Sequence, residues 1–89
     1  MNRDELERAA ALLEEAAEDA ADEAAEAIRT QAEQLRSLVE RERGPDHGRL
    51  DRHQQALRDI EASVDENVSE RIDEANALIT EYRMTLEGV

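Results

Sequence analysis

The sequence predicts an all-α protein built as an antiparallel helical hairpin, and three observations carry this prediction. Strong helix formers fill most of the 89 residues, which include 15 Ala. The helix breakers are few, with three Gly and one Pro, and Pro45 and two of the Gly lie between residues 44 and 48. Apolar residues recur every three or four positions on both sides of that segment. We therefore expect one domain over residues 1–89, with its turn at 44–48.

The first helix is expected over residues 2–43. Asn2 can act as its N-cap, and Glu5 stands three residues later, as a capping box requires. No Gly or Pro occurs before Gly44, and Gly44 followed by Pro45 ends the helix. A helix of about 40 residues would be ~60 Å long.

The second helix is expected over residues 47–87. Its apolar positions are spaced at close to 3.6 residues, so one continuous helix would keep them on one face. Two capping-box patterns interrupt it, Ser63 with Glu66 and Asn67 with Glu70. A kink or break near 64–68, which would give three helices, is the alternative to the continuous helix that we favour.

The two expected helices carry apolar stripes that match when the chain is folded about the turn. Pairing residues whose numbers sum to 92 places an apolar residue opposite each apolar residue of the second stripe from Leu57 outward. Small residues then face large ones, which allows close helix approach. The expected hairpin seam consists of Leu6, Leu13, Ala20, Ile28, Leu35, Leu57, Ile60, Val64, Val68, Ile72, Ile79, Tyr82 and Leu86.

A second apolar face lies beside this seam and would remain exposed in an isolated hairpin. Ordering 89 residues costs about 1.5 kcal/mol each, and Ala-rich layers return little burial. Pairing of two chains into a homodimeric four-helix bundle would bury the second face. The residues expected in this second seam are Leu12, Ala16, Val39, Leu78 and Met84.

The charged residues indicate a salt-rich cytoplasm. The chain has 24 acidic residues, 11 Arg and no Lys, for a net charge of -13. At molar salt such a charge causes little self-repulsion and keeps the surface hydrated, as in halophilic proteins. The charge divides evenly along the chain, with 13 acids and 6 Arg in residues 1–43 and 11 acids and 5 Arg in residues 44–89. Nucleic acid is therefore not an expected partner, and no apolar run is long enough for a membrane span.

No catalytic, metal or cofactor site is expected. Cys is absent, the carboxylates flank the apolar stripe, and no Ser has a His–acid partner at helical spacing. His53 lies on the apolar stripe near Leu38 in the hairpin register, where a structural role is expected. The region around the turn is the least acidic part of the surface, so it is the expected docking site: Arg43, His47, Arg49 and Arg52.

Several short motifs in the C-terminal half resemble a small uncharacterised family of haloarchaeal proteins. They are Arg43-Gly44-Pro45-Asp46, Arg49-Leu50, Glu74-Ala75 and Tyr82-Arg83. The resemblance covers roughly residues 36–85 and implies an acidic helical hairpin with a Pro-containing turn. It implies no activity.

These observations together predict a non-enzymatic structural or protein-interaction module of a halophilic cytoplasm. The expected partner is a protein, first of all a second copy of the chain. Two alternatives are an acidic modulator, or nucleic-acid mimic, that binds a basic partner, and a small dimeric helical enzyme. An Arg-lined pocket would favour the enzyme, whereas binding to a basic protein would favour the modulator.

Overall fold

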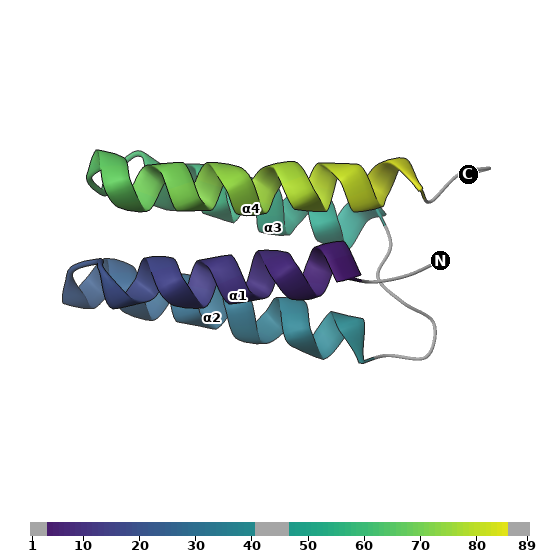
Figure 1. Ribbon diagram of the computed structural model, residues 1–89, viewed down its shortest axis with the longest axis horizontal. Helices are drawn as coiled ribbons and strands as arrows, with labels where there is room; N and C mark the ends of the chain where they lie inside the picture. Colours follow the sequence, from purple (N-terminus) through teal and green to yellow (C-terminus); the bar gives the residue numbers. More distant parts are fainter. Residues whose placement is uncertain (1–3, 41–46, 86–89) are drawn as a thin grey trace.

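Four helices, rather than the expected two, form the protein in the computed structural model, which describes residues 4–40 and 47–85 (Figure 1). The helices are α1 (Asp4–Glu18), α2 (Asp22–Val39), α3 (His47–Glu61) and α4 (Glu66–Met84). The all-α prediction is confirmed. The prediction of two long helices over 2–43 and 47–87 is wrong, because each of them is divided near its middle.

Each helix packs antiparallel against the next, and α4 returns to pack against α1 (Figure 1). The described helices thus form a closed ring of four neighbours, with α1 opposite α3 and α2 opposite α4. The molecule measures 39 × 19 × 18 Å. A continuous 40-residue hairpin would be ~60 Å long, so folding each arm back on itself shortens the protein and doubles the number of helix faces that can be buried.

The first break, between α1 and α2, has no Gly or Pro. The N–H groups of Asp19 and Ala20 donate to carbonyls three residues back, at 3.1 and 3.3 Å, which tightens the last turn of α1. Ala21 is the N-cap of α2, has an extended backbone and provides no side-chain cap. The local signal is electrostatic: α1 ends without a basic residue, whereas Asp22 and Glu23 favourably occupy the first turn of α2.

The second break, between α3 and α4, has a clear local cause. Asp65 is the N-cap of α4, and its carboxylate accepts a hydrogen bond from the Val68 N–H at 3.1 Å. The Ser63 N–H and hydroxyl both donate to the Ile60 carbonyl, at 3.0 and 3.1 Å. The expected alternative of a break near 64–68 was therefore close to the observed position, and the continuous helix that we favoured is wrong.

Most of the expected hairpin-seam residues lie in the hydrophobic core. Nine of them are buried: Leu6, Leu13, Ile28, Leu35, Leu57, Val68, Ile72, Ile79 and Tyr82. Ala20, Ile60 and Val64 are partly buried against the core, and Leu86 lies outside the described residues. The pairing of the first half of the chain with the second half is retained, since α1 packs on α4 and α2 packs on α3.

The second apolar face is largely covered within a single chain. Ala16 is buried, and Leu12, Val39 and Leu78 are partly buried against the core, whereas Met84 is 74% exposed. These residues find neighbours because each arm folds back, so that α1 packs on α2 and α3 packs on α4. A dimer was expected because it would bury this second apolar face, and the fold of a single chain already buries most of it. Self-association stays a prediction.

Candidate functional site: two ends of opposite character

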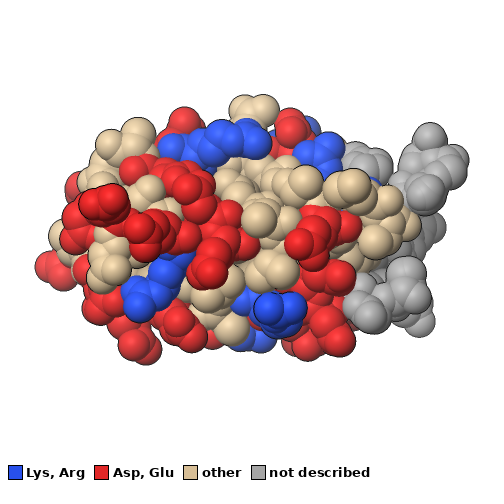
Figure 2. Space-filling model, turned by 45° about the horizontal axis from the view of Figure 1, so that its top comes forward, with Lys and Arg blue, Asp and Glu red and all other residues tan. Residues whose placement is uncertain are grey.

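The two ends of the bundle differ sharply in charge. We define the turn end as residues 12–30 and 55–75, which hold both short turns, and the loop end as residues 4–11, 31–40, 47–54 and 76–85. The turn end contains 14 carboxylates and 3 Arg, whereas the loop end contains 7 carboxylates and 5 Arg. The net charges are therefore -11 and -2. Figure 2 shows the carboxylates crowded over the turn end, on its left side.

Few cations neutralise the turn end. Arg71 of α4 bridges to α1, with its Nη1 2.6 Å from Asp19 Oδ2 and its Nε 3.8 Å from Glu15 Oε1. Arg36 reaches Glu14 from the loop end of α2 through two bonds of 2.9 Å. Both pairs are largely exposed to solvent, where such contacts are individually weak.

One pair of carboxylates at the turn end is crowded. Partial burial and the neighbouring Asp73 carboxyl raise the pKa of Glu61 above the ordinary value. The Ser69 hydroxyl donates to Glu61 Oε2 at 3.0 Å and acts in the opposite direction. Burial is the larger cause of the raised pKa, and the neighbouring Asp73 carboxyl adds to it, whereas the Arg58 charge acts in the opposite direction.

Two hollows open on the turn end. One, of about 460 Å³, is lined by residues of the α1–α2 turn: Ala17, Glu18, Ala20, Asp22, Ala25, Glu26 and Arg29. The other, of about 370 Å³, lies between α2 and α3 and is lined by Ala21, Glu23, Ala24, Ala27, Ile60 and Ser63. Both combine small apolar side chains with carboxylates, so each offers an apolar surface beside negative charge.

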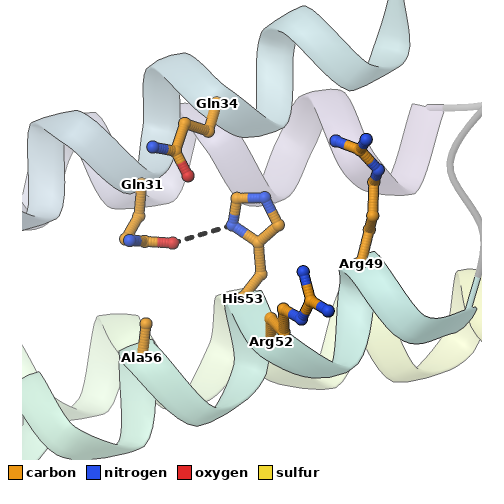
Figure 3. A pocket seen from close by; sticks show the side chains of 6 residues that line it. All are labelled: Gln31, Gln34, Arg49, Arg52, His53 and Ala56. Atoms are coloured by element: carbon orange, nitrogen blue, oxygen red, sulfur yellow. Dashed lines mark hydrogen bonds between the residues drawn. The ribbon is translucent and has the colours of Figure 1, made fainter.

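A third opening, which we call the α2–α3 groove, lies at the loop end. It has two adjoining lobes of about 220 and 140 Å³ that share Gln34, Arg49 and His53. The larger lobe is also lined by Gln31, Arg52 and Ala56, and the smaller by Ser37 and Leu38. Figure 3 shows the two Gln of α2 facing His53 and the two Arg of α3. Among the described residues, the lining of the groove includes no carboxylate.

His53 forms the wall of this groove between the two helices. Its Nδ1 lies 2.7 Å from Gln31 Oε1, and because an amide oxygen only accepts, Nδ1 carries the proton. Burial, and secondarily the Arg49 charge, lower the pKa of His53 below the ordinary value. The ring is therefore neutral at pH 7, and the unprotonated Nε2 is turned away from Gln31 (Figure 3).

Gln54, next to His53, anchors α3 to α4 through buried hydrogen bonds. Its Nε2 donates to the Asn76 carbonyl at 3.1 Å and to Thr80 Oγ1 at 2.9 Å. Its Oε1 accepts from Arg83 Nη1 at 2.8 Å, and Arg83 also contacts Asp51 Oδ1 at 3.4 Å. This network fixes the rotation of α3 and thereby directs His53 and its neighbours toward α2.

The structure brings together part of the expected docking turn. Arg49 and Arg52 both line the α2–α3 groove, whereas Arg43 and the side chain of His47 lie outside the described residues. His53 and Leu38 line the same lobe, as the hairpin register implied. The sequence analysis did not identify Gln31 and Gln34 as site residues. Their signal in the sequence is that two amide side chains interrupt an otherwise Ala-rich stripe, on the side of α2 that faces α3.

Two classes of feature have no candidate within residues 4–40 and 47–85. No group of three His, Asp or Glu side chains lies close enough together to bind a metal ion. No helix in these ranges is long and apolar enough to span a membrane.

Comparison with known proteins gives a family but no activity. A family model described as a family of unknown function (DUF7553) matches residues 1–85. The chain belongs to this family. The match includes the Ala-rich first 30 residues, which the short motifs of the C-terminal half did not cover. Neither the curated proteins nor the solved structures gave a match. Membership of an uncharacterised family is thus confirmed, and the haloarchaeal origin stays a prediction.

Proposed function

We propose that this protein is an interaction module whose turn end binds a cationic segment of a partner protein. The observation that carries the proposal is the unequal distribution of charge, with 14 carboxylates and 3 Arg at one end and 7 and 5 at the other. A general acidic adaptation to salt has no reason to concentrate charge at one end. A binding surface for a cation does.

The shape of the turn end supports a protein segment over a simple ion. Its two hollows are lined by Ala side chains, with Ile60 in one of them, and by carboxylates. Lys and Arg side chains combine an aliphatic stem with a charged head, so they complement an apolar surface next to a carboxylate. Nucleic acid would be repelled by the same surface.

The crowded carboxylates give a further argument. Uncompensated like charges destabilise a folded protein, and the Asp73 carboxyl adds to burial in raising the pKa of Glu61. A cationic partner would relieve this repulsion and gain binding free energy from it. Self-association, the first expectation from the sequence, has less support because the fold covers most of the second apolar face within one chain.

A direct test compares two matched triple variants. The first, Glu18→Gln, Glu23→Gln and Glu26→Gln, neutralises exposed carboxylates that line the turn-end hollows. The second, Glu7→Gln, Glu33→Gln and Glu81→Gln, removes the same charge from exposed sites at the loop end. Binding of a fluorescent peptide of alternating Lys and Leu, with a Glu–Leu peptide as control, is followed by anisotropy at several salt concentrations.

The expected result is a clear difference between the variants. Exposed ion pairs contribute about 0.2–1 kcal/mol each, so we expect the turn-end variant to bind roughly tenfold more weakly. The loop-end variant should lose less than twofold. Equal losses would show that only net charge matters, and failure of the Lys–Leu peptide to bind the wild-type protein would remove the proposal. Size-exclusion chromatography of the same samples also tests the predicted dimer.

A further inference from the structure

The loop end carries an arrangement that the proposed function does not use. Along the α2–α3 groove, the side chains of Arg49, Arg52 and His53 come from successive turns of α3 and face Gln31 and Gln34 of α2 (Figure 3). In a protein with 24 acidic residues, a groove whose lining within residues 4–40 and 47–85 has two Arg and no carboxylate departs strongly from the average surface.

The hydrogen-bonding groups of the groove suit an anion. Each guanidinium offers five N–H donors and no acceptor, and its planar fork matches the oxygens of a carboxylate or phosphate group. Each Gln amide adds two N–H donors. Arg52 makes no ion pair with any described residue, unlike Arg36, Arg71 and Arg83.

The size of the groove suits a small molecule. Its larger lobe has a volume of about 220 Å³, below the ~300 Å³ at which pockets for drug-sized ligands begin. The adjoining lobe of about 140 Å³ is lined by Ser37 and Leu38 and leaves room for a short substituent. An inorganic oxyanion or a compact organic one fits this space.

The strongly negative net charge does not prevent anion binding here. The α3–α4 turn lies about ten residues beyond His53 along α3, which is ~15 Å at 1.5 Å per residue. The Debye length is about 8 Å at physiological ionic strength and about 3 Å at molar salt. The turn-end charges are therefore largely screened at the groove, and the nearby Asp51 carboxylate pairs with Arg83 on the α4 side.

We propose that the α2–α3 groove is a binding site for a small doubly charged oxyanion, a phosphate monoester or a dicarboxylate, held between Arg49, Arg52 and His53. Gln31 orients the imidazole by accepting from Nδ1–H at 2.7 Å. The Nε2 lone pair of the neutral ring would repel an anion, so binding favours uptake of a proton at Nε2, which then donates to the ligand. The site is independent of the turn end and of the partner proposed there.

This arrangement couples anion binding to the protonation of His53. Of the described residues that line the groove, those of α2 include none that titrates near neutral pH, and those of α3 include one, His53, beside the permanently charged Arg49 and Arg52. An anion between the two Arg offsets their repulsion of the imidazolium, so the pKa of His53 rises on binding. Conversely, affinity increases as the pH falls through the pKa of His53 in the complex.

The test follows the His53 imidazole by NMR in the full-length protein. Inorganic phosphate, glycerol phosphate and succinate are titrated separately, with chloride at matched ionic strength as the control. We expect a saturable shift of the His53 resonances and a rise of at least half a unit in the pKa of His53. Saturation by the phosphates alone assigns a phosphoryl group, and saturation by succinate alone assigns paired carboxylates.

Matched variants separate a specific site from general electrostatics. Arg52→Gln removes a groove cation, and Arg8→Gln removes an exposed cation from α1 at the same end. We expect at least tenfold weaker binding for Arg52→Gln and less than a twofold change for Arg8→Gln. Equal effects of the two variants, the same shift with chloride, or no saturation with any of the three anions would each overturn the proposal.

Discussion

The two ends of this bundle share one core and differ in their surfaces. Large apolar residues are fully buried at both ends, Ile72 at the turn end and Ile79 at the loop end. The net charge, however, is concentrated at the turn end, and both His residues and five of the eight described Arg belong to the loop end. Divided along the sequence, the two halves of the chain are nearly equal in charge. The asymmetry arises only because each arm folds back and brings residues near 20 and 64 to the same end.

The largest expected loss of stability comes from a charge placed in the core, and comparing the two ends tests whether they share one core. Ile72→Asp and Ile79→Asp each place a charge at a site with 0% exposure. Each should destabilise the protein by at least ~3 kcal/mol, enough to unfold a marginally stable domain. Urea denaturation followed by circular dichroism measures this loss, and Ala77→Asp, at an exposed site on α4, is the control. Tolerance of either substitution would show that the core does not extend to that end.

The next largest effects come from substitutions at the N-caps Ala21 and Asp65, one in each short turn of the turn end. Asp65→Ala removes the hydrogen bond to the Val68 N–H and should cost ~1 kcal/mol. Ala21→Ser supplies the side-chain cap that α2 lacks and should stabilise the protein by ~0.5–1 kcal/mol. Both changes are measured by denaturation midpoints at constant salt. A loss for Ala21→Ser would mean that the first turn depends on its small side chain rather than on its missing cap.

The same comparison of turns explains which part of the fold the sequence predicts. The break at Asp65 follows from a capping residue, and the sequence placed a possible break within a few residues of it. The break at Ala21 has no such residue, because strong helix formers fill the segment and only the charges of Asp22 and Glu23 favour a new start. Tertiary packing decides there, because α2 can pack against α1 only if the chain turns back between them.

The candidate site likewise contains some residues that the sequence predicts and others that only the fold brings together. Arg49 and Arg52 were predicted as docking residues from the local excess of Arg, and they line the groove together. The contribution of Gln31 could not be predicted, since it depends on how α2 faces α3 across the bundle. The hollow between α2 and α3 also requires the fold, because residues 21–27 and residues 60–63 both line it.

A smaller effect concerns stability and surface charge. The turn-end triple variant removes carboxylates from a crowded surface, and like charges one helical turn apart cost about 0.2–0.5 kcal/mol each. Glu23→Gln also removes a favourable interaction with the N-terminus of α2. In low salt we expect the relief of repulsion to exceed this loss and leave a net gain of about 0.5 kcal/mol in the free energy of unfolding, more than for the loop-end triple variant. The difference should disappear at molar salt, where the Debye length is about 3 Å. Equal gains in low salt would show that the charge asymmetry has no energetic consequence.

The smallest expected effect isolates one carboxylate of the turn end. Because the pKa of Glu61 is raised in the folded state, the folded protein binds a proton there more readily than the unfolded chain does. Its contribution to stability is fully present below the ordinary Glu pKa and is lost as the pH rises through the raised value. Glu61→Gln should abolish this part of the pH dependence and leave the protein slightly more stable at pH 7, with Glu81→Gln at the loop end as the control. Chemical denaturation between pH 3 and 7 measures both, and an unchanged pH profile for Glu61→Gln would show that the pKa of Glu61 is not raised in the folded protein.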